Sequence, residues 1–218
     1  MGVLWSGFLE IFQVSLFWIT QFYGGQLAPA IISFSIIARL VLLPATIQLA
    51  LRGRAHARRI KVLRPALGRV RERWSEDPER MMKETMAVYE RADVKPMDVG
   101  LLRGSLVQMP IFLGLFHAVR GAVETASQGF LWVANIARPD MGIAVLAAAL
   151  MGVSSVAGAT ESQPTWTLAL PALMTGVMAL TLSAGFGLYL AATGLTGTLQ
   201  GLIIRRIEAG QRSSAASV

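Results

Sequence analysis

Five long apolar segments constrain the fold of this chain more than any other feature of its sequence. Each has about 20 mostly hydrophobic residues, enough for a helix to cross a hydrocarbon core roughly 30 Å thick. The composition agrees, because 54% of the 218 residues are hydrophobic and only 15% are charged, unlike an ordinary soluble domain. We therefore predict an all-α membrane protein with a core of five transmembrane helices. The predicted spans cover residues 27–51, 101–120, 141–160, 165–183 and 184–204.

Most basic residues gather in one segment between the first two spans. Residues 52–103 hold 14 of the 20 lysines and arginines against 8 acidic residues, so they carry most of the net charge of +7. Cytoplasmic loops of membrane proteins are enriched in lysine and arginine, so this segment is predicted to be cytoplasmic. After five crossings, the N-terminus would lie outside the cell and the short tail, residues 205–218, inside. The segment 121–140, between the second and third spans, would be external.

Residues 1–26 hold many aromatic side chains and a single charged one, Glu10. Aromatic residues such as tryptophan favour the membrane–water interface, and Ser6, Gln13 and Gln21 join Glu10 in interrupting the apolar face. These features predict an amphipathic helix that lies on the external surface of the membrane. A sixth span is the alternative, and it would move the N-terminus to the cytoplasm.

The basic segment, residues 52–100, is predicted to fold as an antiparallel hairpin of two helices. Apolar residues recur in its first half at alternating spacings of three and four, which is the pattern of a helix seam. Asp77 before Pro78 is typical of a helix start, with aspartate as the N-cap and proline at the first helical position. The predicted seam consists of Ile60, Leu63, Leu67, Val70 and Trp74 on the first helix and of Met82, Thr85, Tyr89 and Ala92 on the second.

The charge of this hairpin favours a membrane surface over nucleic acid. Anionic lipid attracts each basic residue near the surface by about 1 kcal/mol. Proteins that bind single-stranded nucleic acid also need aromatic side chains on which bases stack. The hairpin offers only Trp74 and Tyr89, and both occupy seam positions. We therefore expect no direct binding to DNA.

The first span carries an arginine, Arg39, at its centre. A guanidinium there costs roughly 2.5 to 3.5 kcal/mol on insertion scales, and it stays charged at every physiological pH. None of the five predicted spans contains aspartate or glutamate, so no internal ion pair is available. Ser35 lies one turn before Arg39 and Thr46 two turns after it, on the same helix face. We predict a hydrated cavity where Arg39 meets water or a carboxylate brought by another molecule.

Enzyme chemistry finds little support in the sequence. The chain has no cysteine, its histidines are His56 and His117, and it contains no HExxH or GxSG pattern. We therefore expect no catalysis, no metal site and no cofactor. Two other classes of function stay open. Arg39 would suit a small-molecule transporter for anions, and the GxxxG motif of Gly197 and Gly201 would suit a membrane assembly scaffold or, more simply, close packing within the bundle.

Several stretches of the sequence together resemble the YidC/Oxa/Alb family of membrane-protein insertases. They are IIARLVLLP around Arg39, KVLRPAL and MAVYERADVKPM in the basic segment, and LVQMPIFLGLF in the second span. The segment before the family's third core span resembles FLWVANIARPD, and its final span resembles GLYLAATGLTGTLQ. The resemblance covers essentially the whole chain, which it identifies as a single insertase domain, residues 1–218.

The resemblance implies a hydrophilic groove that opens to the cytoplasm and to lipid but is closed on the outside. In the family, the arginine that Arg39 matches receives the polar, often acidic, part of a client protein while the client's apolar segment enters the bilayer. Gln108 matches a groove glutamine of the second core span, and Tyr189 lies in a motif that helps to line the groove. Together with Ser35 and Thr46, these residues form the predicted substrate-binding site.

The resemblance also implies partners and a location. We expect nascent or newly made membrane proteins as clients, contact with membrane lipids, and a place in the bacterial cytoplasmic (inner) membrane. The Sec translocase is a candidate partner, whereas the short tail, with Arg205, Arg206 and Arg212, predicts weak or absent contact with the ribosome. The hairpin matches the element that receives substrates or partner machinery in the family. Its predicted partner-binding residues are Arg58, Arg59, Lys61, Arg64, Arg71 and Arg73.

Overall fold

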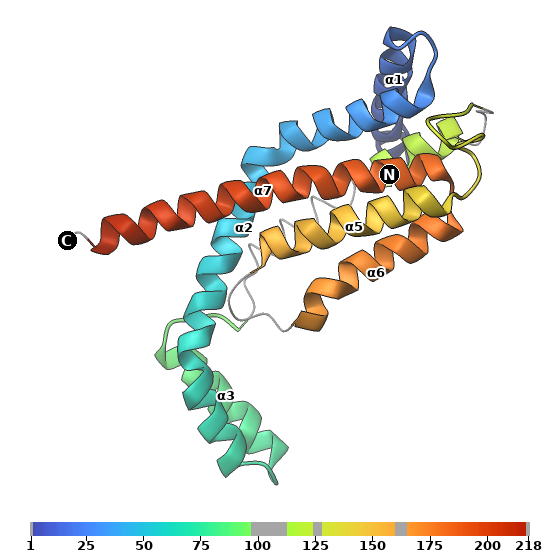
Figure 1. Cartoon of the computed structure of the whole chain (residues 1–218). Helices are drawn as coiled ribbons and strands as arrows, with labels where there is room; N and C mark the ends of the chain where they lie inside the picture. Colours follow the sequence, from blue (N-terminus) through green and yellow to red (C-terminus); the bar gives the residue numbers. More distant parts are fainter. Residues whose placement is uncertain (1, 97–112, 124–127, 160–164, 217–218) are drawn as a thin grey trace. The chain divides into compact units, whose positions relative to one another are not determined.

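The computed structural model describes residues 2–96, 113–123, 128–159 and 165–216 (Figure 1). The regular elements in these ranges are helices, apart from an isolated β-bridge between Phe130 and Val133, so the predicted all-α fold is confirmed for them. The chain divides into two compact units, a first of Met1–Ile47 with Met109–Val218 and a second of Gln48–Gln108. The helices are α1 (Gly2–Phe22), α2 (Leu27–Arg73), α3 (Pro78–Arg91), α5 (Met141–Gly158), α6 (Thr165–Thr181), α7 (Ala184–Ala216) and a shorter helix, Leu113–Val123.

Three helices in the described ranges, α2, α5 and α7, are long and apolar enough to cross a membrane. They contain the predicted first, third and fifth spans. The fourth predicted span corresponds to α6, whose 17 residues make an apolar helix of about 26 Å, at the short end for a span. The second predicted span, 101–120, lies mostly outside the described residues, and its last part belongs to the apolar helix Leu113–Val123. The complete five-helix core therefore stays a prediction.

Helix α1 has 21 residues and packs against α2 in the first unit. Leu16 is buried, and Phe12 packs edge-on against Phe34 of α2, with ring centroids 6.3 Å apart. Trp18 and Phe22 on other positions of α1 are exposed. The exposed aromatic side chains agree with a helix at a membrane interface, although its place on the external surface stays a prediction.

No break separates the first predicted span from the first predicted hairpin helix. Helix α2 runs without interruption over 47 residues. The sequence around the expected boundary, QLALRGRAHAR, is rich in alanine, leucine and arginine, which favour helix and give it no reason to end there. Helix α7 likewise continues past residue 204 and reaches Ala216. Hydropathy therefore locates the apolar part of each long helix but not the point where the helix ends.

A tight turn joins α1 to α2 in the first unit. Gly24 and Gly25 adopt positive φ angles of 63° and 86°, which glycine tolerates without steric cost. The side chain of Gln128 fastens this turn, because its Oε1 accepts a hydrogen bond from the Leu27 N–H and its Nε2 donates one to the Gly25 carbonyl, both at 2.9 Å. The start of α2 is therefore tied to the loop that precedes α5.

The same loop, residues 128–140, also holds the starts of α5 and α7. Asp140 is the N-cap of α5, and its carboxylate accepts a hydrogen bond from the Ile143 N–H at 2.9 Å. The carbonyl of Ile136 accepts a hydrogen bond from the N–H of Gly185, in the first turn of α7, also at 2.9 Å. The helices α2, α5 and α7 therefore all begin at one end of the first unit.

Helix α7 packs against α5 through glycines that bring the two backbones together. A Cβ atom added at Gly194 would lie 2.7 Å from the carbonyl carbon of Leu150, and one added at Gly201 would lie 2.7 Å from that of Ala157. Small residues at such positions let membrane helices approach closely. The GxxxG motif thus serves close packing within the bundle, which confirms the simpler of its two interpretations.

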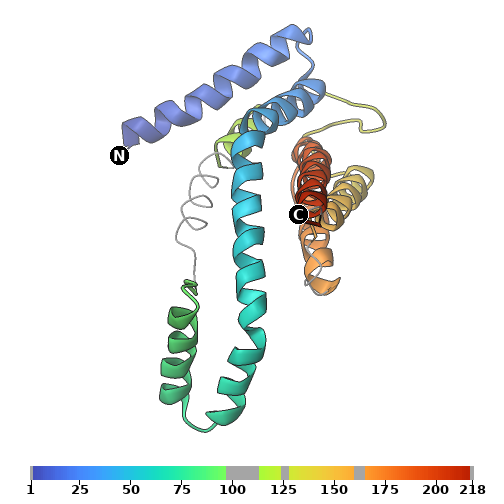
Figure 2. The same cartoon turned by 90° about the vertical axis from the view of Figure 1, so that its left-hand side faces the viewer.

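The second unit contains the last part of α2, and α3 runs back beside it (Figure 2). The predicted start of α3 is confirmed, because the carboxylate of Asp77 accepts a hydrogen bond from the Arg80 N–H at 3.0 Å and Pro78 opens the helix. The ring of Trp74 lies 5.8 Å and 5.1 Å from the guanidinium carbons of Arg73 and Arg80. Cation–π contacts and a capped helix therefore stabilise the turn between α2 and α3.

The predicted seam of this hairpin is right on α2 and partly wrong on α3. All five residues predicted for the first helix are half-buried, four of them on α2 and Trp74 directly after it. On α3, the predicted Thr85 and Tyr89 are half-buried, as are Met81 and Val88. Met82 is exposed, and so is Ala92, which directly follows the helix. Two of the four predicted positions are therefore right. The half-buried face begins at Met81, and Met82 is turned by about 100° from it.

The contact between α5 and α7 predicts different effects of alanine at two glycines of α7. Gly201→Ala would press a methyl group against the α5 backbone and should destabilise the chain by about 1–3 kcal/mol, the usual cost of overpacking. Gly210 has open space around it, so Gly210→Ala is the matched control. It should be neutral or stabilising by up to about 1 kcal/mol, because alanine favours helix. Thermal unfolding of both variants in one detergent measures the difference, and equal midpoints would contradict the close contact.

Candidate functional site

A row of polar side chains lies between α2 and α7 in the first unit. Helix α2 contributes Arg39 and Thr46, and α7 contributes Tyr189, Thr193 and Gln200, which together form the polar seam. Both helices are apolar enough to cross a membrane. Polar and charged residues in such helices usually face the interior of a bundle or a hydrated cavity and mark functional sites. The polar seam is therefore the candidate site of this unit.

Arg39 is the charged member of the polar seam. Its side chain is half-buried, and its guanidinium lies next to the hydroxyl of Tyr189, which in turn neighbours that of Thr193. The buried Nε of Arg39 has no hydrogen-bond partner in the described ranges. Within those ranges, no carboxylate forms an ion pair with Arg39 either. Among the described residues, the neighbours of this charge are therefore hydroxyl groups and not an acid.

Tyr189 is the buried aromatic member of the polar seam, next to Arg39. The residue is fully buried in the first turns of α7. Its ring packs on Phe186 at a centroid distance of 5.4 Å, and Phe186 meets Phe116 edge-on at 5.1 Å. Aromatic contacts of this geometry stabilise a core beyond the area that they bury. The hydroxyl of Tyr189 is thus held in a fixed position next to the guanidinium.

Thr46 and Gln200 form the other end of the polar seam. The hydroxyl of Thr46 donates to the carbonyl of Leu43 at 3.0 Å and lies 3.3 Å from Oε1 of Gln200. Thr46 follows Arg39 by seven residues on α2, and Gln200 follows Thr193 by seven on α7. The two helices therefore run in the same direction, and the seam extends over about 10 Å along them.

The remaining predicted groove residues take other positions. Ser35 is fully buried, and its hydroxyl donates to the carbonyl of Ile31 at 2.6 Å, so it is satisfied within its own helix. Gln108 lies outside the described residues. Gln200 was not predicted, although its spacing of seven residues from Thr193 and eleven from Tyr189 could have placed it on their helix face.

The basic residues predicted to bind partners lie in the second unit. All six side chains are exposed at the surface of the hairpin. They are Arg58, Arg59, Lys61, Arg64, Arg71 and Arg73.

Comparison with known proteins adds independent information. The family model described as 60Kd inner membrane protein matches residues 18–211. Membrane protein insertase YidC 2 of Listeria monocytogenes is 31% identical over 144 residues, which are 64% of this chain and 52% of the relative. Membrane protein insertase MisCB of Bacillus subtilis is 25% identical over 236 residues, which are 99% of this chain and 85% of the relative. The match thus spans about half of the first relative and most of the second.

These relatives are named as insertases, and insertases of this family are not enzymes. The family's description and the apolar helices α2, α5 and α7 agree with a membrane protein. Because the family model covers most of the sequence, the chain belongs to the 60Kd inner membrane protein family, which is the YidC/Oxa1 family that its sequence resembles.

Proposed function

We propose that the chain is a membrane-protein insertase whose polar seam receives the polar part of a client protein. One observation carries the proposal. The half-buried charge of Arg39 lies in an apolar helix and has no carboxylate partner in the part of the chain that the structure describes. The names of the curated relatives support the same function.

Arg39 would lower the cost of moving an acidic tail into the membrane. A bare carboxylate is very costly to bury in an apolar medium. An opposite charge 4 Å away attracts it by about 4 kcal/mol at an effective dielectric constant of about 20. The hydroxyls of Tyr189 and Thr193 would add hydrogen bonds to neutral polar groups of the client. Acidic tails would therefore bind best, and other polar tails would bind without strict sequence preference.

Exposed apolar residues lie on other faces of α2, close to the charged group in the sequence. Ile37, Leu40 and Val41 of α2 are exposed, and they flank Arg39 in the sequence. In a bilayer such side chains face lipid or the apolar segment of a client. A client could therefore place its polar tail at Arg39 and its apolar segment along α2. Burial of that segment in lipid, at about 25 cal/mol per Å² of apolar surface, would then drive its release.

The directions of the helices support the proposed topology. Helices α2, α5 and α7 begin at the same loop, as the first, third and fifth spans of a five-span protein would. With the N-terminus outside, this loop is external and the second unit is cytoplasmic. The exposed basic side chains of the hairpin would then meet clients, anionic lipids or the Sec translocase. We expect little contact with the ribosome and none with DNA.

Substitution of Arg39 tests whether its charge receives the tail. Arg39→Ala should slow the insertion of a short single-span client with an acidic tail by about ten-fold, which corresponds to about 1.4 kcal/mol. A client with a neutral tail should be affected less, and Arg39→Lys should retain most of the activity because it keeps the charge. The measurement is protease protection of the client in cells depleted of their own insertase.

Arg138→Ala is the matched control, because Arg138 is an exposed arginine of the same unit that lies outside the polar seam. It should insert both clients as the wild-type chain does. Full activity of Arg39→Ala on the acidic client would contradict the role of the charge. A wild-type chain that reaches the membrane but rescues neither client would contradict the insertase itself and favour a scaffold or an anion transporter. Anion flux in liposomes would separate these two.

Tyr189→Phe tests whether the tyrosine positions the guanidinium. The variant removes one hydroxyl and keeps the ring that packs on Phe186. Insertion of the acidic client should fall several-fold in the otherwise unchanged chain. In an Arg39→Ala background the same change should have no further effect, because side chains that act together are not additive. Independent, additive losses in the two backgrounds would show that the two residues do not act as a pair.

A further inference from the structure

Two apolar side chains stand at the tip of the loop that precedes α5. Phe130 and Val133 exchange two backbone hydrogen bonds, of 2.8 Å and 2.9 Å, and enclose a two-residue turn of Leu131 and Trp132. Leu131 is 72% exposed and Trp132 is 60% exposed. Turn residues are usually small or polar, and neighbouring exposed apolar side chains mark contact surfaces for proteins or membranes.

Leu131 holds a backbone conformation that favours glycine. Its φ angle is 53°, in the left-handed region where the Cβ of an L-residue crowds the following carbonyl. Glycine is the usual residue at such positions of a two-residue hairpin turn. The leucine side chain is also largely exposed, so its packing inside the chain contributes little to stability. A contact outside the chain would explain why leucine occupies this position.

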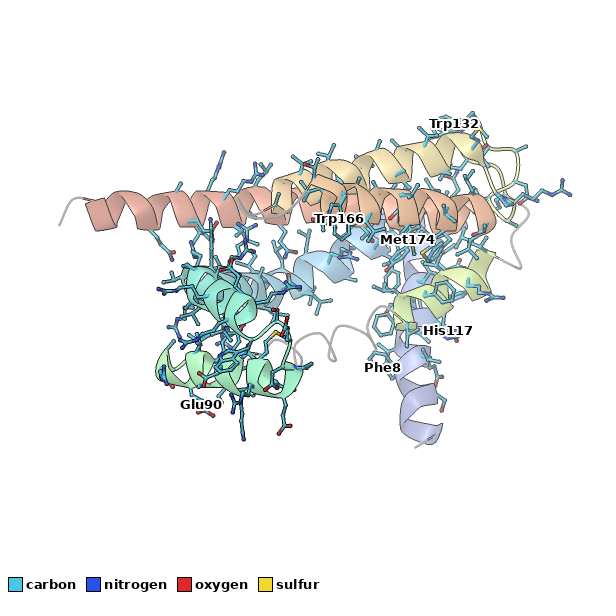
Figure 3. All side chains as sticks on the ribbon, turned by 90° about the horizontal axis from the view of Figure 1, so that it is seen from below. Phe8, Glu90, His117, Trp132, Trp166 and Met174 are labelled. Carbon is cyan, nitrogen blue, oxygen red and sulfur yellow. The ribbon has the colours of Figure 1, made fainter. Side chains whose placement is uncertain are left out.

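Trp132 is held in place by the start of α5. Its indole Nε1–H donates a hydrogen bond to the Asp140 carboxylate at 3.1 Å, and the same oxygen caps the helix. Gly142 leaves room for the ring, because a Cβ atom there would lie 2.8 Å from the indole nitrogen. Figure 3 shows Trp132 at this end of α5. Since the polar edge of the indole faces the helix, the exposed surface of the ring is apolar carbon.

We infer that Leu131 and Trp132 form a membrane anchor that inserts into the lipid interface at this end of α5. The helix is long and apolar enough to cross a bilayer, so its first residues lie where water meets hydrocarbon. Met141, which is 72% exposed, and Val145 continue the apolar surface of the turn along the helix. Tryptophan favours this boundary, since it has an apolar body and one N–H donor. The partner is the lipid bilayer itself, and the anchor does not depend on insertase activity.

Native fluorescence of Trp132 can test the anchor in the full-length chain. Replacing the other four tryptophans with phenylalanine leaves Trp132 as the single emitter. In nanodiscs, lipids brominated near the headgroup end of the acyl chains should quench it strongly, and aqueous acrylamide should quench it weakly. The four positions to be replaced are Trp5, Trp18, Trp74 and Trp166.

Two variants of the chain with Trp132 as its single tryptophan distinguish the contribution of Leu131 from effects of any apolar substitution. Leu131→Gly removes the apolar side chain and relieves the backbone, so lipid quenching should fall several-fold and acrylamide quenching should rise. Val153→Ala shortens another exposed apolar side chain of α5, away from the loop, and should change neither. Lipid quenching that persists in Leu131→Gly would overturn the role of Leu131.

The measurement on Trp132 with an unaltered loop decides the proposal even if Leu131→Gly fails to fold. Strong quenching by acrylamide without quenching by the brominated lipids would overturn it. That result would place the turn in water.

Discussion

The charge of Arg39 within an apolar helix is the constraint around which the first unit is organised. A guanidinium in hydrocarbon is costly unless it meets water, an acid or hydrogen-bonding groups. In the described ranges no acid neutralises it, and its near neighbours are the hydroxyl groups of Tyr189 and Thr193. Hydroxyl groups lower the cost of the charge without cancelling it. The attraction for a negative group is therefore preserved, as the proposed function requires.

The side chains around Arg39 stay next to it only if the neighbouring helices are held in fixed positions. Glycines bring α7 onto the backbone of α5, and one loop fixes the starts of α2, α5 and α7. The pairs Arg39 with Tyr189 and Thr46 with Gln200 then fall in register along two helices that run the same way. Other faces of α2 present exposed apolar residues such as Val41. The same helix thus carries a polar and an apolar surface, which matches a client that has both.

Apolar length and the location of charge can be read directly from a sequence, so the apolar helices α2, α5 and α7 and the position of Arg39 within one of them were predictable. The direction in which a side chain faces was harder to predict, because it depends on the neighbouring helices. Ser35 lies one turn from Arg39, yet it faces the core. The sequence alone does not assign Gln200 to the site, because a glutamine near the end of a span is common and its contact with Thr46 is visible only in the structure. Met82 was assigned to the wrong face of α3 because helix patterns one residue apart compete.

Water access to residue 39 tests the central claim most directly. The chain has no cysteine, so a single introduced cysteine is a unique target for a membrane-impermeant thiol reagent. In nanodiscs, Arg39→Cys should react readily, whereas Val41→Cys, which replaces an exposed apolar residue of the same helix, should stay unreactive until detergent is added. If both positions are equally protected, Arg39 lies in a dry environment and the proposed role of the polar seam is wrong.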